Sequence, residues 1–83
     1  MRRIKGFVMC ETTRRLLSRF KVFWYESHND MVEHDFGSET EGFFELIIPD
    51  QIRKIFIQKD NYQSVCIHLN PQASAYIAKI KKT

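Results

Sequence analysis

Alternation of apolar and polar side chains along the chain predicts several β-strands. In residues 43–48, Phe44, Leu46 and Ile48 would share one face of a strand. Residues 21–26 are rich in β-branched and aromatic side chains, which favour strands. The predicted strands span residues 4–10, 21–26, 43–48, 52–58 and 62–69. For 52–58 a helical turn capped by Asp50 is the competing prediction, and the pattern does not decide between them.

Two segments have apolar residues at helical spacing. In the first, Thr12 or Thr13 would cap a helix that continues to Phe20. Its outer face would carry Arg14, Arg15 and Arg19. The second helix would begin at Asn70-Pro71 and continue to the C-terminal lysines. Its apolar positions would be Ala73, Tyr76, Ile77 and Ile80.

The predicted fold class is α+β, with element order β-α-β-β-β-β-α. A small antiparallel or mixed sheet of four or five strands would carry the two short helices. Residues 1–83 would form a single domain. Residues 27–42 would be a polar, acidic loop, and a loop of that length is often functional or contains a short extra strand.

Charge is segregated along the chain. Residues 1–21 carry seven basic side chains and one acid, residues 22–50 carry eight acids and no Lys or Arg, and residues 51–83 carry six basic side chains and one acid. Neutralisation between these blocks in the folded chain is one interpretation. The other is that a basic surface contacts phosphate or an acidic surface contacts a basic partner.

The composition indicates a soluble protein of the cytoplasm. The net charge is +3 and no apolar run approaches membrane-spanning length, so no membrane contact is expected. Cys10 and Cys66 lack CxxC spacing and are expected to be free thiols.

No motif in the sequence predicts catalysis. The densest polar cluster contains His28, Asp30, Glu33, His34 and Asp35. Its spacing matches no zinc motif, so a solvated segment without metal or cofactor is expected. The protein is therefore predicted not to be an enzyme.

Eleven aromatic residues in a chain of 83 exceed what one sheet face needs, so an apolar second face is expected to meet the long loop, a ligand or a twin subunit. We predict a small regulatory or inhibitory protein-binding module, and a homodimer is the favoured assembly. The predicted protein-binding residues are Phe23, Tyr25, Phe43, Glu33, Asp35, Glu39 and Glu41.

Nucleic-acid binding is the alternative prediction. The arginine face of the first helix would contact phosphate, and Phe23 or Tyr25 would stack on bases. The residues predicted for this site are Arg14, Arg15, Arg19, Lys21, Arg2 and Arg3.

Overall fold

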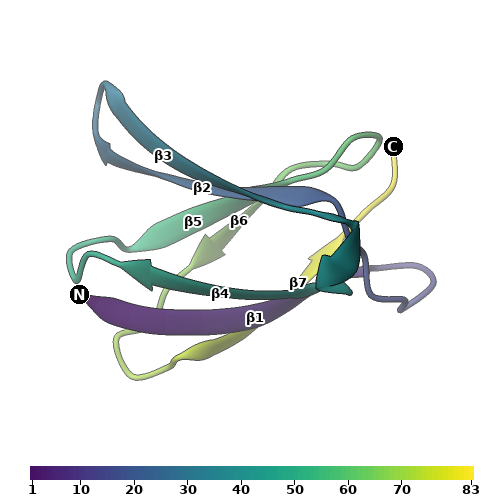
Figure 1. Cartoon of the computed structure of the whole chain (residues 1–83), viewed down its shortest axis with the longest axis horizontal. Coiled ribbons are helices and arrows are strands. Elements are labelled where there is room, and N and C mark those ends of the chain that lie inside the picture. Colours follow the sequence, from purple (N-terminus) through teal and green to yellow (C-terminus); the bar gives the residue numbers. More distant parts are fainter.

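Seven strands form two sheets that lie one over the other as two layers (Figure 1). The computed structural model describes residues 1–83. The three-stranded sheet contains, in spatial order, β4 (Phe43–Ile48), β1 (Arg2–Cys10) and β7 (Ala75–Ile80). The four-stranded sheet contains β3 (Asp30–Phe36), β2 (Phe20–Ser27), β5 (Lys54–Gln58) and β6 (Val65–His68). The predicted α+β class is therefore wrong, because the chain folds as a β-sandwich.

β1, the central strand of the smaller sheet, brings the first and last strands of the chain side by side. β1 pairs with β4 in antiparallel orientation and with β7 in parallel orientation. All pairs in the larger sheet are antiparallel. A turn of 3-10 helix, η1 (Ser38–Thr40), is the only helical segment, and the structure has no apolar helix of bilayer-spanning length.

The core lies between the sheets and takes one face of each strand. In β4, Phe44, Leu46 and Ile48 are buried while Phe43 and the residues alternating with it are exposed, which confirms the predicted alternation. Trp24 and Phe44 are the largest fully buried side chains. The buried cluster is Ile4, Val8, Phe20, Val22, Trp24, Phe44, Leu46, Ile48, Ile52, Ile55, Ile57, Leu69, Ala78 and Ile80.

The first predicted helix is absent, and residues 11–19 form a loop. One helical turn starts where the Arg14 amide donates to the Cys10 carbonyl at 2.8 Å. The turn ends at Arg14, whose φ of 62° is left-handed, and Arg19 is left-handed as well, with φ of 56°. The loop instead runs along the end of β1, where the Leu17 amide donates to the Val8 carbonyl at 2.9 Å. Pairing with β1 satisfies backbone groups that a helix would have satisfied internally.

The second predicted helix is β7. The capping signal at Asn70 closes a turn, since its side-chain oxygen accepts from the Gln72 amide at 2.8 Å and its carbonyl accepts from the Ala73 amide at 3.0 Å. From there the chain extends, with Ala78 and Ile80 buried and Ile77 exposed. The same apolar residues fit both a helical and an alternating period, and parallel pairing with β1 selects the strand.

The predicted acidic loop contains a seven-residue strand. β3 pairs with β2 along the outer edge of the larger sheet, so the expectation of a loop over residues 27–42 is wrong and its alternative of an extra strand is confirmed. Residues 52–58, for which the sequence left strand and helical turn open, form a turn followed by a strand. The Ile52 amide donates to the Pro49 carbonyl at 3.2 Å in a turn, and β5 follows.

Gly6 permits a close approach of its neighbours inside the smaller sheet. It lies on the buried side of β1, in register with Phe44 and Tyr76. A Cβ atom at Gly6 would lie 2.7 Å from Phe44 Cζ and 2.7 Å from the Tyr76 carbonyl oxygen. One of these neighbours is backbone held by strand pairing, so the strands themselves would have to separate.

Replacement of Gly6 by alanine is expected to lower the free energy of unfolding by about 2–3 kcal/mol through this overpacking. Gly37→Ala is the matched control, because the three atoms nearest to its Cβ would all belong to the flexible carboxylate of Glu39, the nearest at 2.7 Å. The control is expected to change stability by less than about 0.5 kcal/mol. Urea unfolding of both variants measures the difference, and equal stabilities would show that the strands absorb the extra methyl group.

Candidate functional site

The outer face of the larger sheet carries a packed aromatic cluster. Phe23 on β2 and Phe56 on β5 are in register and stack, with ring centroids 5.2 Å apart at 16°. Tyr25 stands nearly perpendicular to both rings, at 6.1 Å and 6.0 Å. Met31, opposite Tyr25 on β3, extends the cluster to the sheet edge. We call Phe23, Tyr25, Phe56 and Met31 the aromatic face.

The aromatic face is open to solvent in spite of this packing. Tyr25 is 51% exposed and Met31 is 47% exposed, while the stacked rings of Phe23 and Phe56 are partly buried. Next to Tyr25 a hollow of about 240 Å³ is bordered by Arg53, Lys54 and His68. The face therefore presents rings, a hydroxyl group and a recess of side-chain size.

Charged groups border the aromatic face. Lys21 Nζ lies 3.2 Å from Glu33 Oε2, and Asp35 is in register with Lys21 on β3. Lys54 Nζ lies over the Phe56 ring, 5.8 Å from its centroid. Because Lys21 is paired with Glu33, the exposed Asp35 leaves the β3 border acidic.

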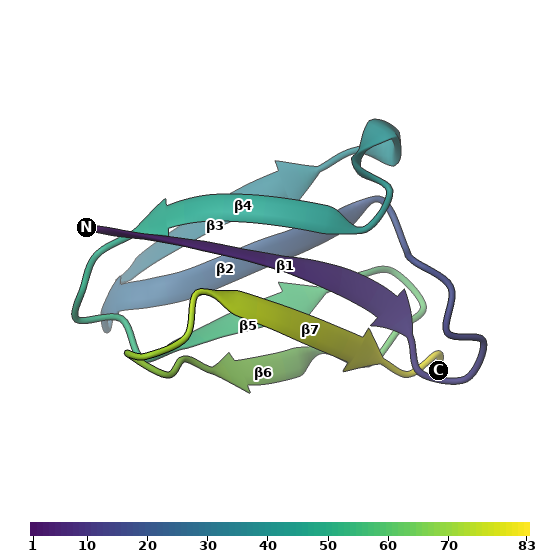
Figure 2. The ribbon, with the colours of Figure 1, turned by 90° about the horizontal axis from the view of Figure 1, so that it is seen from below.

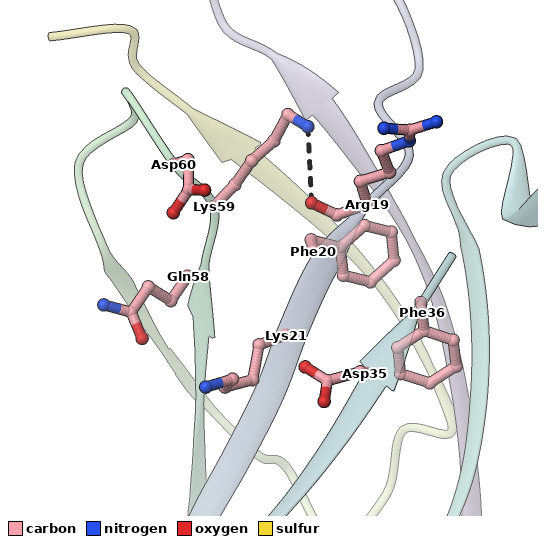
Figure 3. Close-up of a pocket in the computed structure, with 8 residues that line it drawn as sticks. All are labelled: Arg19, Phe20, Lys21, Asp35, Phe36, Gln58, Lys59 and Asp60. Carbon is pink, nitrogen blue, oxygen red and sulfur yellow. Dashed lines mark hydrogen bonds between the residues drawn. The ribbon is translucent and has the colours of Figure 1, made fainter. Parts of the chain in front are cut away.

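A polar pocket of about 370 Å³ lies beyond this border, at one end of β2 (Figure 3). Lys21 and Asp35 extend into the region from neighbouring strands, and Phe20 and Phe36 stack at one side, 5.2 Å apart. Lys59 Nζ donates to the Ser18 carbonyl at 2.6 Å and to the Arg19 carbonyl at 3.3 Å. The full lining is Arg19, Phe20, Lys21, Asp35, Phe36, Gln58, Lys59 and Asp60. The Lys59 ammonium group is therefore already hydrogen-bonded to backbone carbonyls. The other charged residues that line the pocket include both basic and acidic side chains.

The structure brings together part of the predicted protein-binding set. Phe23, Tyr25, Glu33 and Asp35 share the outer side of the β2–β3 hairpin. Phe43 does not join them, because it lies on the outer side of the other sheet, with its ring 5.4 Å from that of Phe7. Glu39 and Glu41 also lie elsewhere: Glu39 belongs to η1, and Glu41 follows it in left-handed conformation.

Phe56 and Met31 belong to the aromatic face but were not predicted as part of it. Phe56 lies in the segment whose structure the pattern left undecided, and alternation with Ile55 and Ile57 was the signal for its outward direction. Met31 lies in β3, which the sequence presented mainly as a polar loop.

The predicted nucleic-acid residues are dispersed. Arg14, Arg15 and Arg19 lie on the loop of residues 11–19, so their shared helix face does not exist. Arg3 pairs with Glu45 at 3.8 Å, and Lys21 pairs with Glu33 as described. These are the only ion pairs between basic and acidic side chains, and strand register also places Lys5 beside Glu45, so the charge blocks neutralise one another in part.

Arg2 has a structural position. Its Nη2 atom donates to the Asn70 carbonyl at 3.0 Å and to the Ala73 carbonyl at 2.8 Å. The Tyr76 hydroxyl hydrogen-bonds to the same two carbonyls, each at 3.1 Å. The guanidinium group thus ties the turn before β7 to the start of β1 and is directed at carbonyl oxygens.

The side chains of the predicted polar cluster do not converge on one point. His34 stacks on Trp24 with ring centroids 5.5 Å apart, and no group of three or more His, Cys, Asp or Glu side chains is placed to hold an ion. Both cysteines are free, as predicted. Hydrogen bonds with Thr13 lower the pKa of Cys10, and the bond with the Thr13 backbone has a larger effect than the bond with its side chain. Burial raises the pKa of the neighbouring Tyr62. Because Cys10 is only 4% exposed, its thiol is shielded from reactants in solution.

The two hydrogen bonds from Arg2 to the Asn70 and Ala73 carbonyls, which we call the Arg2 clamp, are expected to stabilise the fold. Arg2→Ala should lower the free energy of unfolding by about 1–2 kcal/mol, since two carbonyls lose a charged donor. Arg3→Ala, which removes an exposed and long ion pair from the same strand, should cost less than about 0.5 kcal/mol. Thermal or urea unfolding distinguishes the two, and an Arg2→Ala variant as stable as Arg3→Ala would contradict the clamp.

Comparison with known proteins gives no relative from which a function can be transferred: no protein-family model and no curated protein matches the chain. The function is therefore argued from the surfaces described above.

Proposed function

We propose that this protein is a small non-enzymatic module that binds another protein, or a second copy of itself, in a regulatory or inhibitory role. The aromatic face is the contact surface. The observation that supports this proposal is the packed cluster on the outside of the sheet, in which Phe23 and Phe56 are partly buried and Tyr25 is exposed. The two free thiols accord with a reducing compartment such as the cytoplasm.

Preorganisation makes the aromatic face suited to binding. Aromatic side chains and methionine are enriched in the centres of protein interfaces, where they lose water-exposed apolar area. Each ring here is already held by its neighbours at 5.2–6.1 Å, so little rotamer freedom remains to be lost when a partner binds. The exposed tyrosine adds a hydroxyl group that can hydrogen-bond at the rim of the contact.

The border charges indicate the chemistry of the partner. Asp35 is exposed at the β3 edge, and Arg53 and Lys54 lie on the other side of the rings, whereas Glu39 and Glu41 lie farther along the chain, on the connection that leaves β3. The acidic β3 edge would attract basic groups of the partner and set its orientation, while the aromatic rings would supply most of the affinity. We therefore expect a partner surface with apolar side chains next to Lys or Arg.

The double variant Tyr25→Ala/Met31→Ala tests the proposal. Both side chains are about half exposed, so stability should change by less than about 1 kcal/mol, whereas affinity for the partner should fall at least about tenfold. Immobilised wild-type and variant chains would be used to capture partners from cells of the source organism, followed by titration of any captured protein. Ile47→Ala, exposed on the opposite sheet, is the matched control and should bind as the wild type does.

A partner retained equally by the wild type, the double variant and the control would contradict the aromatic face as the contact surface. Sedimentation of the same three chains separates a foreign partner from self-association. A dimer lost only in the double variant would make the second copy the partner.

Nucleic-acid binding is the second candidate, now through a loop and not a helix. Arg14 and Arg15 are exposed and form no ion pair. Their loop lies at the same end of the sandwich as the C-terminus, where Lys81 and Lys82 are also exposed (Figure 2). Unpaired cations gathered at one end of a molecule can contact phosphates.

Charge reversal tests this second candidate. If the loop contacts phosphate, Arg14→Glu/Arg15→Glu should abolish binding of labelled single- or double-stranded oligonucleotides, and wild-type affinity should fall linearly with salt on logarithmic axes. Arg3→Glu, on the outer face of the smaller sheet, is the control. Fluorescence anisotropy measures all three chains. Absence of wild-type binding at low salt, or equal binding by the reversed variant, would rule out this mode.

A further inference from the structure

The outer face of the smaller sheet carries a second apolar surface. Strand register places Phe43, Phe7 and Ile77 in one row across β4, β1 and β7. The next row contains Leu16 and Met9, joined by an isolated bridge. We call these five residues the apolar band. Ile77 is 62% exposed and Leu16 is 47% exposed, so the band is not covered by the chain itself.

Basic side chains border the apolar band. Lys5 precedes it on β1, and Lys79 is in register with Met9 on β7. Neither lysine forms an ion pair. Glu45 is the only acid among the outward residues of the three strands, and it lies 3.8 Å from Arg3. Glu45 is also in register with Lys5, so the outward face carries Arg3, Lys5 and Lys79 against one acid and keeps an excess of positive charge.

A hollow of about 450 Å³ connects the band with this charged border. Lys5, Phe7, Ala75 and Ile77 line it, together with Gly6 and Tyr76. It exists because Ala75, in register with Lys5, has only a methyl group where its neighbours carry long side chains. An apolar side chain placed over Ala75 would contact Phe7 and Ile77, and a carboxylate next to it would reach the Lys5 ammonium group.

We infer that the apolar band docks an acidic, apolar segment of a partner protein. Charge complementarity selects this occupant, because apolar side chains fill the hollow while Asp or Glu pairs with Lys5 and Lys79. A second copy related by two-fold symmetry fits less well, since it would place the same excess of cations on both sides of one interface. The band and the aromatic face lie on opposite sides of the sandwich, so the module can hold two proteins at once (Figure 1).

Peptide selection on the intact chain tests this inference. Random-peptide phage display on the wild-type protein, with counter-selection on the Ile77→Ser variant, should enrich sequences that combine Asp or Glu with Leu, Ile or Phe. In fluorescence anisotropy, Ile77→Ser should weaken the selected peptides at least about tenfold, as loss of a central interface residue does. Lys5→Glu should weaken them about fivefold or more, with a larger effect at low salt, because it reverses the complementary charge.

A third test variant and a control complete the experiment. Ala75→Glu fills the hollow and adds a negative charge at another exposed position, so it should also abolish binding even if Ile77→Ser proves poorly folded. The Tyr25→Ala/Met31→Ala variant should bind the peptides within twofold of the wild type. Loss of peptide binding at the apolar band is thereby distinguished from loss of partner binding at the aromatic face.

Three results would overturn the inference. The first is enrichment of basic or uncharged peptides, or of none. The second is equal affinity in wild type, Ile77→Ser, Lys5→Glu and Ala75→Glu. The third is wild-type self-association in sedimentation that Ile77→Ser abolishes, which would assign the band to a second copy.

Discussion

A single constraint governs this structure: each strand of a two-sheet sandwich can direct only one of its faces into the core. Side chains alternate along each strand, so burying Phe44, Leu46 and Ile48 forces Phe43 and Ile47 outward. The same alternation in β2 buries Trp24 and leaves Tyr25 in solvent. With no helices to cover either sheet, the chain has no further layer for these outward apolar residues. The aromatic face and the apolar band are the direct result.

Much of the strand content was predictable from the sequence, whereas the class of fold was not. Alternation identified the strands around Val8, Trp24, Phe44, Ile57 and Ile67, because local burial sets that pattern. The helix predictions failed where the deciding interactions are non-local. Ala78 and Ile80 fit either period, and only pairing with β1, more than sixty residues earlier in the chain, selects the strand. The positive φ angles of Arg14 and Arg19 have no glycine to mark them in the sequence.

The candidate site was predictable to the extent that its residues share a hairpin. Phe23, Tyr25, Glu33 and Asp35 were predicted together and lie together, because β2 and β3 are adjacent in the chain. Phe43 was assigned to the same surface and lies on the other sheet. Its position depends on the pairing of β4 with β1, which the alternation of a single strand does not specify. Arg2 carried a charge that suggested phosphate, yet in the structure it hydrogen-bonds to carbonyl groups of the turn before β7.

Charge gives the two outer surfaces different characters. Acids concentrate on the β3 side of the aromatic face and Arg53 and Lys54 lie on its other side, while the apolar band is bordered mainly by basic side chains. The segregation visible along the sequence is partly cancelled in space, since Arg3, Lys5 and Lys21 lie beside acids of the middle block. The proposal that the module connects two different proteins rests on these two apolar surfaces, which lie on opposite sides of the sandwich.

Site-specific photo-crosslinking inside living cells would test most directly whether the outward apolar residues are contact surfaces. A photoreactive phenylalanine analogue would be placed in turn at the exposed positions of Tyr25, Ile77, Arg14 and Gln63. The account predicts discrete protein adducts from positions 25 and 77 and none from position 63. Adducts only from position 14, or none from positions 25 and 77, would contradict it and direct attention to the loop of residues 11–19.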